Sequence, residues 1–186
     1  MSQNPFKDKL DIITGDNIIL RPITADDTDD IVRWRNDPEV QKFFIFREPF
    51  TREMHCNWLE TKVETGKVIQ YMIIDKADGK SVGSVYLKDV DRANESAEYG
   101  IFIGERSARG RGIGSEAARI FTDFAFAELD LHRISLRLLS DNVAARRSYE
   151  NAGFVKEGCF SDMVKVDGRF VDIVFMAKLK EKKKEN

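Results

Sequence analysis

The sequence contains little cysteine, no long apolar run and no excess of charge of either sign. Cys56 and Cys159 lie far apart and have neither a CxxC spacing nor any other metal-ligand spacing. No stretch of 18 apolar residues is present, so no transmembrane helix is expected. The 30 basic and 32 acidic residues give a net charge of −2, whereas nucleic-acid-binding domains are usually strongly basic. We therefore expect no metal, no membrane partner and no nucleic-acid partner.

The scarcity of cysteine also bears on the cellular compartment. One disulfide between Cys56 and Cys159 is compatible with the sequence, but we expect two buried free thiols in a reducing compartment. Residues 1–11 are polar and lack the apolar core of a signal peptide. Together these features predict a cytoplasmic protein.

Proline is absent after Pro49, which leaves the following 137 residues without the residue that most often interrupts helices and strands. A length of 186 residues fits one domain, and a hydrophobic content of 42% is too high for a wholly disordered chain. We therefore expect a single domain over residues 1–186. The only basic run begins at Lys178, and residues 179–186 are expected to form a disordered, solvated tail.

The first half of the chain predicts two helices after a short strand. The strand over 18–21 stops at a proline, and Thr24 stands three positions before Asp27, which is the form of a capping box. The helix that follows is expected to end near Asp37, because the residue before a proline disfavours helical geometry. After an aromatic connection, a second helix is expected over about 51–64.

The second half predicts a sheet that changes from hairpins to alternation with helices. Asp-Gly pairs at 78–79 and 167–168 indicate hairpin turns. Strands are expected over 69–75, 81–90 and 97–103, then a helix from 113, a strand over 133–139, a helix over 142–151, and strands over 154–157 and 170–178. The fold class is therefore mixed α/β: a central, largely antiparallel sheet with one βαβ unit, flanked by helices.

A glycine-rich segment joins the strand over 97–103 to the next helix. It reads Arg109-Gly110-Arg111-Gly112-Ile113-Gly114. Free N–H groups and the positive end of the helix dipole suit a phosphate or pyrophosphate there, and glycine lets the backbone come close. The segment lacks the Gly-Lys-Ser/Thr of a P-loop and the dinucleotide-binding fingerprint. A flexible glycine turn with no ligand is the alternative.

A second informative segment runs from Asn142 to Phe154. Asn142 stands where a strand gives way to a helix, so capping that helix is a sufficient explanation for it. Ala145 and Tyr149 are four residues apart and share a helix face, where a tyrosine is often a core residue. Gly153 suits the position just after a helix.

Taken together, the two segments resemble the GNAT superfamily of N-acetyltransferases. The coenzyme A loop of that superfamily has the form Arg/Gln-x-x-Gly-x-Gly/Ala, which Arg109, Gly112 and Gly114 match. Its second motif, Asn-x-x-Ala-x-x-x-Tyr-x-x-x-Gly-Phe, is matched by Asn142, Ala145, Tyr149, Gly153 and Phe154. More narrowly, the segments 20–22 and 34–40 resemble the RimJ/RimL-like branch and enzymes that acetylate nucleotide-linked amino sugars.

The resemblance implies a GNAT fold and direct transfer of an acetyl group from acetyl-CoA, the co-substrate, to a primary amine. It implies that Tyr149 is the general acid that protonates the leaving thiolate, and that Asn142 hydrogen-bonds the pantetheine arm. A backbone N–H of Phe102 or Ile103 is expected beside the thioester, with the register open by one residue. The expected co-substrate contacts are Phe102, Ile103, Arg109, Gly110, Arg111, Gly112, Ile113, Gly114, Ser115 and Asn142.

The general base is less well determined by the sequence. A free amine has a pKa near that of lysine, about 10, so a base or a water chain must take its proton. The resemblance points to Glu98, for which a solvated carboxylate at a strand end is the alternative. Of the two histidines, His55 is expected in the helix that borders the acceptor pocket, and His132 is expected to be structural.

The acceptor site is expected between Trp34 and Trp58, a region that holds several phenylalanines and Arg35, Arg47 and Arg52. Aromatic rings and guanidinium groups suit a nucleotide-linked amino sugar, although the phenylalanines can instead close the core or a dimer surface. We expect a small-molecule or peptide amine: an amino sugar nucleotide or a protein N-terminal amine, with a polyamine or other small amine as the alternative. A non-catalytic acyl-CoA-binding sensor is the competing class, and a homodimer is expected by resemblance.

Overall fold

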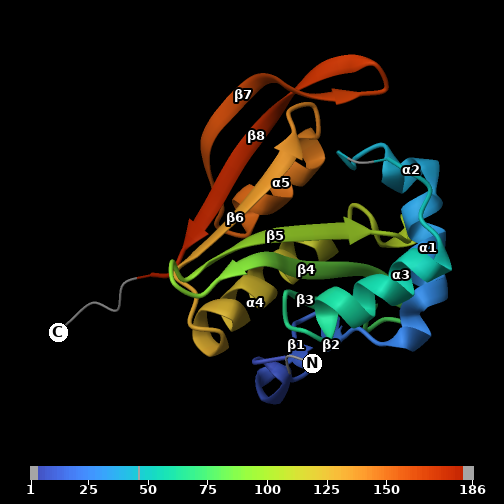
Figure 1. Cartoon of the computed structure of the whole chain (residues 1–186), viewed down its shortest axis with the longest axis vertical. Helices are drawn as coiled ribbons and strands as arrows, with labels where there is room; N and C mark the ends of the chain where they lie inside the picture. Colours follow the sequence, from blue (N-terminus) through green and yellow to red (C-terminus); the bar gives the residue numbers. More distant parts are fainter. Residues whose placement is uncertain (1–3, 46, 182–186) are drawn as a thin grey trace.

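The computed structural model describes residues 4–45 and 47–181, which form one eight-stranded sheet with helices packed against it (Figure 1). The strands are β1 (Ile13–Thr14), β2 (Ile18–Pro22), β3 (Val68–Asp75), β4 (Ser81–Asp91), β5 (Ser96–Ile103), β6 (Arg133–Leu139), β7 (Val155–Val166) and β8 (Arg169–Leu179). The helices are α1 (Thr28–Asn36), α2 (Pro38–Gln41), α3 (Arg52–Trp58), α4 (Ile113–Glu128) and α5 (Val143–Asn151). Shorter 3-10 or π-helical turns lie at Lys7–Lys9, Ala25–Asp27, Leu59–Val63 and Arg106–Ala108.

The strand order across the sheet is β1-β2-β3-β4-β5-β6-β8-β7. Every neighbouring pair is antiparallel except β5 and β6, which are parallel and are connected through α4. This arrangement confirms the predicted mixed α/β class, with a meander followed by a single βαβ unit. It also places β8 between β6 and β7.

Side-chain caps start the helices where the sequence predicts them. The capping box of Thr24 and Asp27 is present and leads through a 3-10 turn into α1. The hydroxyl of Thr51 accepts a hydrogen bond from the N–H of Met54 at the start of α3. Each cap satisfies a backbone donor that the first turn leaves without an intrahelical partner.

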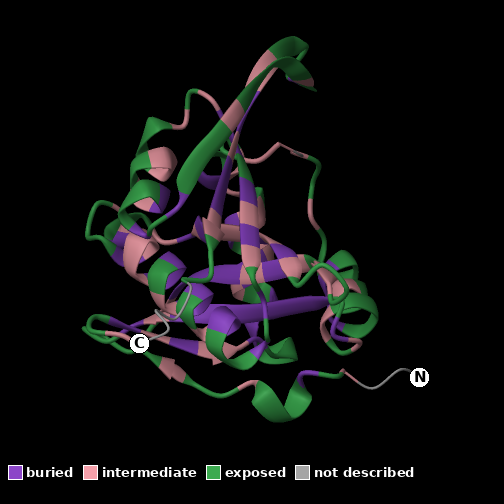
Figure 2. Cartoon of the chain, turned by 90° about the vertical axis from the view of Figure 1, so that its left-hand side faces the viewer, coloured by how far each residue is buried: buried purple, intermediate pink, exposed green. Residues whose placement is uncertain are grey.

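Helices cover both faces of the sheet, as two neighbouring residues of β3 illustrate. Tyr71 points to one face, where its ring lies 5.2 Å from that of Phe121 in α4. Met72 points to the other face, where it packs in a cluster with Trp34 of α1 and Leu59. Successive side chains of a strand alternate between faces, so α4 and α5 lie on one side and α1 and α3 on the other. Figure 2 shows the buried residues concentrated along the central strands.

The β7–β8 hairpin is longer than predicted. A strand was expected only over 154–157, whereas β7 runs to Val166. Most of its side chains are exposed, and its register with β8 shifts twice, between Lys156 and Gly158 and between Phe160 and Val164. An exposed, irregular strand has no clear alternation of apolar and polar residues, so its pattern does not reveal it. The hairpin extends away from the rest of the sheet (Figure 1).

The structure bears on the expectations about the two cysteines, the C-terminal segment and transmembrane helices. Both cysteines are free, but both are exposed, so the expectation of buried thiols is wrong. The segment 179–186 begins inside the sheet: Leu179 pairs with Arg133, and the N–H of Lys180 donates to the carbonyl of His132 (2.8 Å). Residues 182–186 lie outside the described residues. Within residues 4–45 and 47–181, no helix is long and apolar enough to cross a membrane.

Candidate active site

Strands β5 and β6 start as parallel neighbours and then diverge (Figure 1). Their pairing covers only residues 96–98 of β5 against 133–135 of β6. β5 nevertheless continues to Ile103, and β6 pairs with β8 along its length. Residues 99–103, here called the open edge of β5, therefore have no strand partner on the β6 side among the described residues. Such an edge offers peptide N–H and C=O groups to a ligand that contains amides.

The direction of the peptide groups along this edge follows from one hydrogen bond. The N–H of Gly104 donates to the carbonyl of Val82 (2.9 Å) and so points toward β4. Because peptide groups alternate along a strand, the N–H of Phe102 also points toward β4, and those of Ile101 and Ile103 point to the open side. Of the two residues expected beside the thioester, Ile103 presents a free N–H there and Phe102 does not.

The glycine-rich loop lies at the C-terminal end of β5 and leads directly into α4. Gly110 and Gly112 have positive φ values of 74° and 79°, which disfavour residues with a side chain. A Cβ built at either position would meet nothing within 4 Å, so the backbone there is open to approach. The first backbone hydrogen bond of α4 is donated by the N–H of Glu116 to the carbonyl of Gly112 (3.0 Å). The N–H groups of residues 113–115 therefore remain for an anion at the start of a 16-residue helix.

The two arginines of the loop have different surroundings. The Arg109 guanidinium lies 3.4 Å from the carbonyls of Ile103 and Gly104, at the end of the open edge. The Arg111 guanidinium instead donates to both carboxylate oxygens of Asp75, at 2.5 and 3.3 Å. This hydrogen bond holds the pKa of Asp75 below its usual value. Arg111, expected among the co-substrate contacts, is thus engaged in tying the loop to β3.

Helix α5 lies beside α4 and carries the second sequence motif. The side-chain oxygen of Asn142 accepts a hydrogen bond from the N–H of Ala145 (3.1 Å), so Asn142 does cap the helix. This cap uses the amide oxygen alone and leaves the amide nitrogen for another partner. The hydroxyls of Ser115 and Ser148 lie 3.0 Å apart and link the first turn of α4 to α5.

Tyr149 is buried on the α5 face that packs against the sheet. Its ring lies 6.1 Å from that of Tyr99 on β5 and 5.9 Å from that of Phe154. Burial raises the pKa of the Tyr149 phenol well above its usual value, so the hydroxyl keeps its proton at neutral pH. Both explanations in the sequence, packing and proton donation, are compatible with this position.

Glu98, the proposed base, is neither free nor simply solvated. Its carboxylate lies 3.0 Å from the ammonium of Lys88 on β4 and 3.1 Å from the guanidinium of Arg137 on β6. It lies at the last paired position before β5 and β6 diverge. The two ion pairs hold the carboxylate directly before residue 99, where the open edge begins.

Tyr86 on β4 is a site residue that the sequence did not reveal. It pairs with Gly100 of β5, and a Cβ on Gly100 would lie 2.2 Å from Cζ and 2.4 Å from the hydroxyl oxygen of Tyr86. The phenol therefore lies against Gly100 in the open edge of β5, which is possible only because Gly100 has no side chain. Burial raises its pKa, and the charges acting on it are those of Lys88, Arg35, Glu98 and Arg137. A glycine inside a strand was the available signal, because it often marks a close approach.

Neither histidine is exposed beside the open edge of β5. His55 is buried, and His132 lies just before the start of β6. His55 is 1% exposed, and its Nδ1 lies 3.0 Å from the hydroxyl of Thr28 in α1. Burial lowers its pKa. His55 lies in α3, the helix expected to border the acceptor pocket, but a substrate could contact its side chain only if that side chain were uncovered first. His132 precedes β6, and its N–H donates to the Glu95 carbonyl (2.7 Å), in keeping with a structural role.

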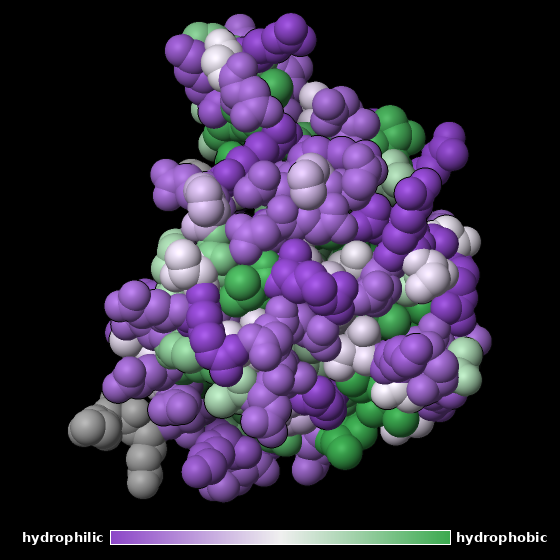
Figure 3. Space-filling view, turned by 90° about the vertical axis from the view of Figure 1, so that its right-hand side faces the viewer, coloured by the Kyte–Doolittle hydropathy of each residue, from purple (hydrophilic) through white to green (hydrophobic). Residues whose placement is uncertain are grey.

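The phenylalanines between α2 and α3 contribute to the packing on the α1 side. Phe44 lies edge-on to Phe102 of β5, with ring centroids 5.8 Å apart, and Phe50 lies 6.1 Å from the His55 ring. Phe43 is exposed, and Phe46 lies outside the described residues. On the face that carries α1, α2 and α3, apolar side chains appear in separate groups within a mostly hydrophilic surface (Figure 3).

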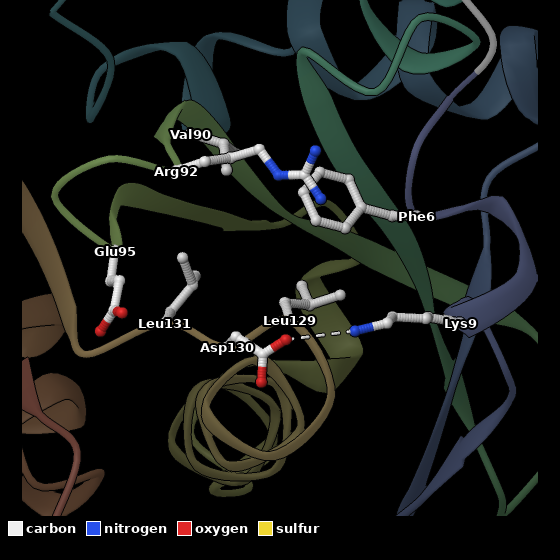
Figure 4. Close-up of a pocket in the computed structure, with 8 residues that line it drawn as sticks. All are labelled: Phe6, Lys9, Val90, Arg92, Glu95, Leu129, Asp130 and Leu131. Atoms are coloured by element: carbon white, nitrogen blue, oxygen red, sulfur yellow. Dashed lines mark hydrogen bonds and ion pairs between the residues drawn. The ribbon is translucent and has the colours of Figure 1, made fainter.

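A separate pocket of about 170 Å³ lies at the opposite end of β5 (Figure 4). Its lining includes Glu95, which precedes β5, and the ion-paired Lys9 and Asp130. The loop that follows β5 is at the other end of that strand, so this pocket contains none of the expected site residues. Within the described part of the chain, no group of three or more His, Cys, Asp or Glu side chains is placed to hold a metal ion.

The open edge of β5, the start of α4 and the phenol of Tyr149 thus combine three chemical capacities. The edge can pair with an extended amide-containing chain, and the helix start can bind an anionic group. The protonated phenol can donate a proton. A molecule in which an amide-containing chain is joined to a pyrophosphate could occupy both features, with its amides along the open edge and its pyrophosphate at the start of α4.

Comparison with known proteins agrees with this arrangement. The sequence model of the family described as "Acetyltransferase (GNAT) domain" matches residues 17–155. The chain is 28% identical over 176 residues to the uncharacterized N-acetyltransferase p20 of Bacillus licheniformis, covering 92% of this chain and 97% of that one. It is 26% identical over 165 residues to the spermidine N(1)-acetyltransferase of Vibrio cholerae serotype O1, covering 89% of this chain and 94% of that one.

The solved structures show the same fold. The crystal structure of spermidine N-acetyltransferase from Vibrio cholerae in complex with CoA and spermine superposes with a TM-score of 0.81. The two sequences are 24% identical over 88% of this chain and 95% of that one. The predicted fold class is therefore confirmed.

Proposed function

Since the chain belongs to the acetyltransferase (GNAT) domain family, we propose that its open β5 edge, α4 start and Tyr149 carry acetyl transfer from acetyl-CoA to a primary amine. The chain is an acyl-CoA-dependent N-acetyltransferase; the roles of its individual residues are our proposal. The observation that carries it is the divergence of β5 from β6 after Glu98, directly before the glycine-rich start of α4.

Binding of the co-substrate would use mainly backbone groups. The peptide groups of Ile101 and Ile103 are directed so that they can pair with the pantetheine amides along the open edge. The N–H groups of residues 113–115, with Gly110 and Gly112 giving open access, suit the pyrophosphate. The amide nitrogen of Asn142 is left to donate to the pantetheine arm.

The transfer itself makes one bond and breaks one. The neutral amine nitrogen attacks the acetyl carbon, the new C–N bond replaces the C–S bond, and negative charge develops first on the acetyl oxygen. The N–H of Ile103 would donate to that oxygen, and its direction toward the open side of β5 supports this role. Tyr149 donates its proton to the departing sulfur, and the raised pKa of its phenol keeps that proton available.

The proton of the attacking amine goes to Glu98 through water, because Glu98 and Ile103 lie five positions apart in an extended strand. The ion pairs with Lys88 and Arg137 hold the carboxylate in a fixed position on β5. Glu98 is also on the Tyr86 side of the sheet, the side that carries α1 and α3.

We propose an amino sugar nucleotide or a protein N-terminal amine as the acceptor, within the RimJ/RimL-like branch. A polyamine is the second candidate, because the chain is similar in both sequence and structure to spermidine N-acetyltransferase of Vibrio cholerae. A polycation would favour an acidic site. Lys88 and Arg137 are paired with Glu98, whereas Arg35 has no ion-pair partner among the described residues, which favours an anionic acceptor such as an amino sugar nucleotide. A cytoplasmic location and a homodimer stay predictions.

The test is thiol release from acetyl-CoA across a panel of UDP-amino sugars, short peptides with free N-termini, spermidine and aminoglycosides. Tyr149→Phe is expected to keep CoA affinity, measured by calorimetry, and to lower kcat by about 10²-fold or more. Tyr99→Phe is the matched control, because its buried hydroxyl has no hydrogen-bond partner in the described part of the chain. Equal kcat in both variants would refute the role of Tyr149. CoA binding without turnover on any amine would favour the sensor class.

A further inference from the structure

Three arginines lie in the region expected to bind the acceptor, and two of them are already paired. Arg47 donates to the carboxylate of Asp167 at the tip of the β7–β8 hairpin (2.5 Å). Arg52 is paired with Asp29 of α1. Arg35 forms no ion pair with any described residue. Of the three arginines, it is therefore the one whose positive charge is not paired with a carboxylate.

The Arg35 guanidinium is held in a defined position despite having no anionic partner. It stacks between the rings of Phe44 and Phe50, at 4.8 and 4.6 Å from their centroids. Its Nε is buried and has no hydrogen-bond partner among residues 4–45 and 47–181. Burial lowers its pKa. The Nη groups are not among the buried, unpartnered atoms, so an anion that pairs with them would offset part of the free-energy cost of burying the charge.

Arg35 is also next to the reacting region. The Phe44 ring on which it stacks packs against Phe102 of β5, and the charge of Arg35 acts on the Tyr86 hydroxyl above Gly100. Phe102 belongs to the open edge, and it points to the same face of the sheet as Gly100 and Glu98. Arg35 therefore lies on the α1 side of β5, which also carries Tyr86 and Glu98.

The neighbouring charges do not neutralise it. Glu98 already binds both Lys88 and Arg137, and no carboxylate of the described residues forms an ion pair with Arg35. The site thus retains an excess of positive charge centred on Arg35. A polyamine would be repelled by this charge, whereas a carboxylate or phosphate would be attracted.

We propose that Arg35 binds an anionic group of the acceptor, so that the preferred acceptor is an amine that also carries a carboxylate or a phosphate. This proposal rests on the proposed function and names the substrate class of the same site. The planar guanidinium can receive either oxyanion in a bidentate contact, while Phe44 and Phe50 hold its plane. An entirely structural role, in which Arg35 only packs between the two rings, predicts no dependence on acceptor charge.

The first test uses matched acceptors with the full-length chain. Alanine is compared with alaninamide for a carboxylate, glucosamine 6-phosphate with glucosamine for a phosphate, and spermidine serves as the cationic amine. We expect the anionic member of at least one pair to have kcat/KM about 10- to 100-fold higher than its neutral match. Arg35→Gln should remove that preference, Arg35→Lys should retain part of it, and Arg52→Gln should leave it unchanged.

Two results would overturn the proposal. One is equal use of the anionic and neutral members of both pairs by the unmodified protein. The other is an Arg35→Gln variant, folded by its melting curve, that loses the same factor with every acceptor. The pair that shows the preference identifies which oxyanion the site takes.

A second measurement does not depend on turnover. The Nε–H resonance of Arg35, assigned by its loss in Arg35→Gln, is followed while inorganic phosphate or acetate is added with and without CoA. A saturable shift of this resonance that exceeds that of the Arg52 Nε–H supports the proposal, and no such shift with either anion overturns it. Failure of the proposed function is recognised separately, as absence of both CoA binding and thiol release with all amines.

Discussion

Replacement of Gly100 by alanine tests the most unusual contact in the site. The new Cβ would lie 2.2 to 2.6 Å from three atoms of the Tyr86 phenol, whereas carbon atoms prefer separations of about 3.5–4.0 Å. The ring would have to retreat by about 1 Å, away from the open edge of β5. Overpacking of this kind costs about 1–3 kcal/mol. We therefore expect Gly100→Ala to lower the free energy of unfolding by that amount.

A double-mutant cycle assigns the cost to Tyr86. In a Tyr86→Ala background the obstructing ring is absent, and Gly100 has no positive φ that an alanine would strain. There, Gly100→Ala should be neutral or should stabilise by about 0.4–1 kcal/mol, because alanine loses less backbone entropy on folding. The coupling energy between the two sites should therefore exceed about 1 kcal/mol.

The assay is urea denaturation of the four proteins of the cycle, with the m-value as a check on two-state unfolding. Gly158→Ala is the matched control, because it also lies in a strand but its Cβ would meet only Phe160, at 3.8 Å. It should change the free energy of unfolding by less than about 0.5 kcal/mol. An equal cost of Gly100→Ala with and without the Tyr86 ring would refute the proposed contact.

Three further changes test other parts of the molecule. Burial holds the pKa of His55 below its usual value of 6.5, so the unfolded chain binds a proton at this histidine more readily than the folded protein does. The urea midpoint should therefore fall as the pH is lowered through and below about 6.5. The fall should be smaller in His55→Gln. An identical pH dependence in both proteins would exclude His55 as the cause. Glu98→Gln should lower kcat by about 10²-fold if the carboxylate is the base, and unchanged kcat would exclude it. Thr51→Ala removes the α3 cap and should cost about 1 kcal/mol in the free energy of unfolding, whereas no change would show that the cap is dispensable.

Features encoded by neighbouring residues could be predicted from the sequence. The capping box of Thr24 and Asp27 is fixed by a spacing of three residues, and the structure contains it. The meander, the βαβ unit and the glycine-rich start of α4 also follow from local periodicity and turn residues. The alternation of peptide groups that selects Ile103 over Phe102 needed the register with β4, which only the folded sheet supplies.

The other features of the site depend on residues distant in sequence. Tyr86 meets Gly100 across two strands, so neither residue is informative alone. Arg35 stands out only because Arg47 pairs with Asp167, 120 residues away, and Arg52 pairs with Asp29. Nothing in a single sequence shows which arginines find a carboxylate. The prediction that the cysteines are buried was wrong, because a single sequence does not show which faces of α3 and β7 are exposed, and both thiols lie on exposed faces.

The place of β8 in the sheet has a consequence for how the chain is made. It is synthesised after every other strand, yet it is inserted between β6 and β7 and buries Ile173, Val174 and Met176. Until it emerges from the ribosome, β6 has only its short pairing with β5, and β7 has no neighbour within the described sheet. A nascent chain that stops before Arg169 would thus expose the edges of both strands, and such edges readily pair with other chains. Both edges are covered only once β8 has been made, which is after the residues of the candidate site.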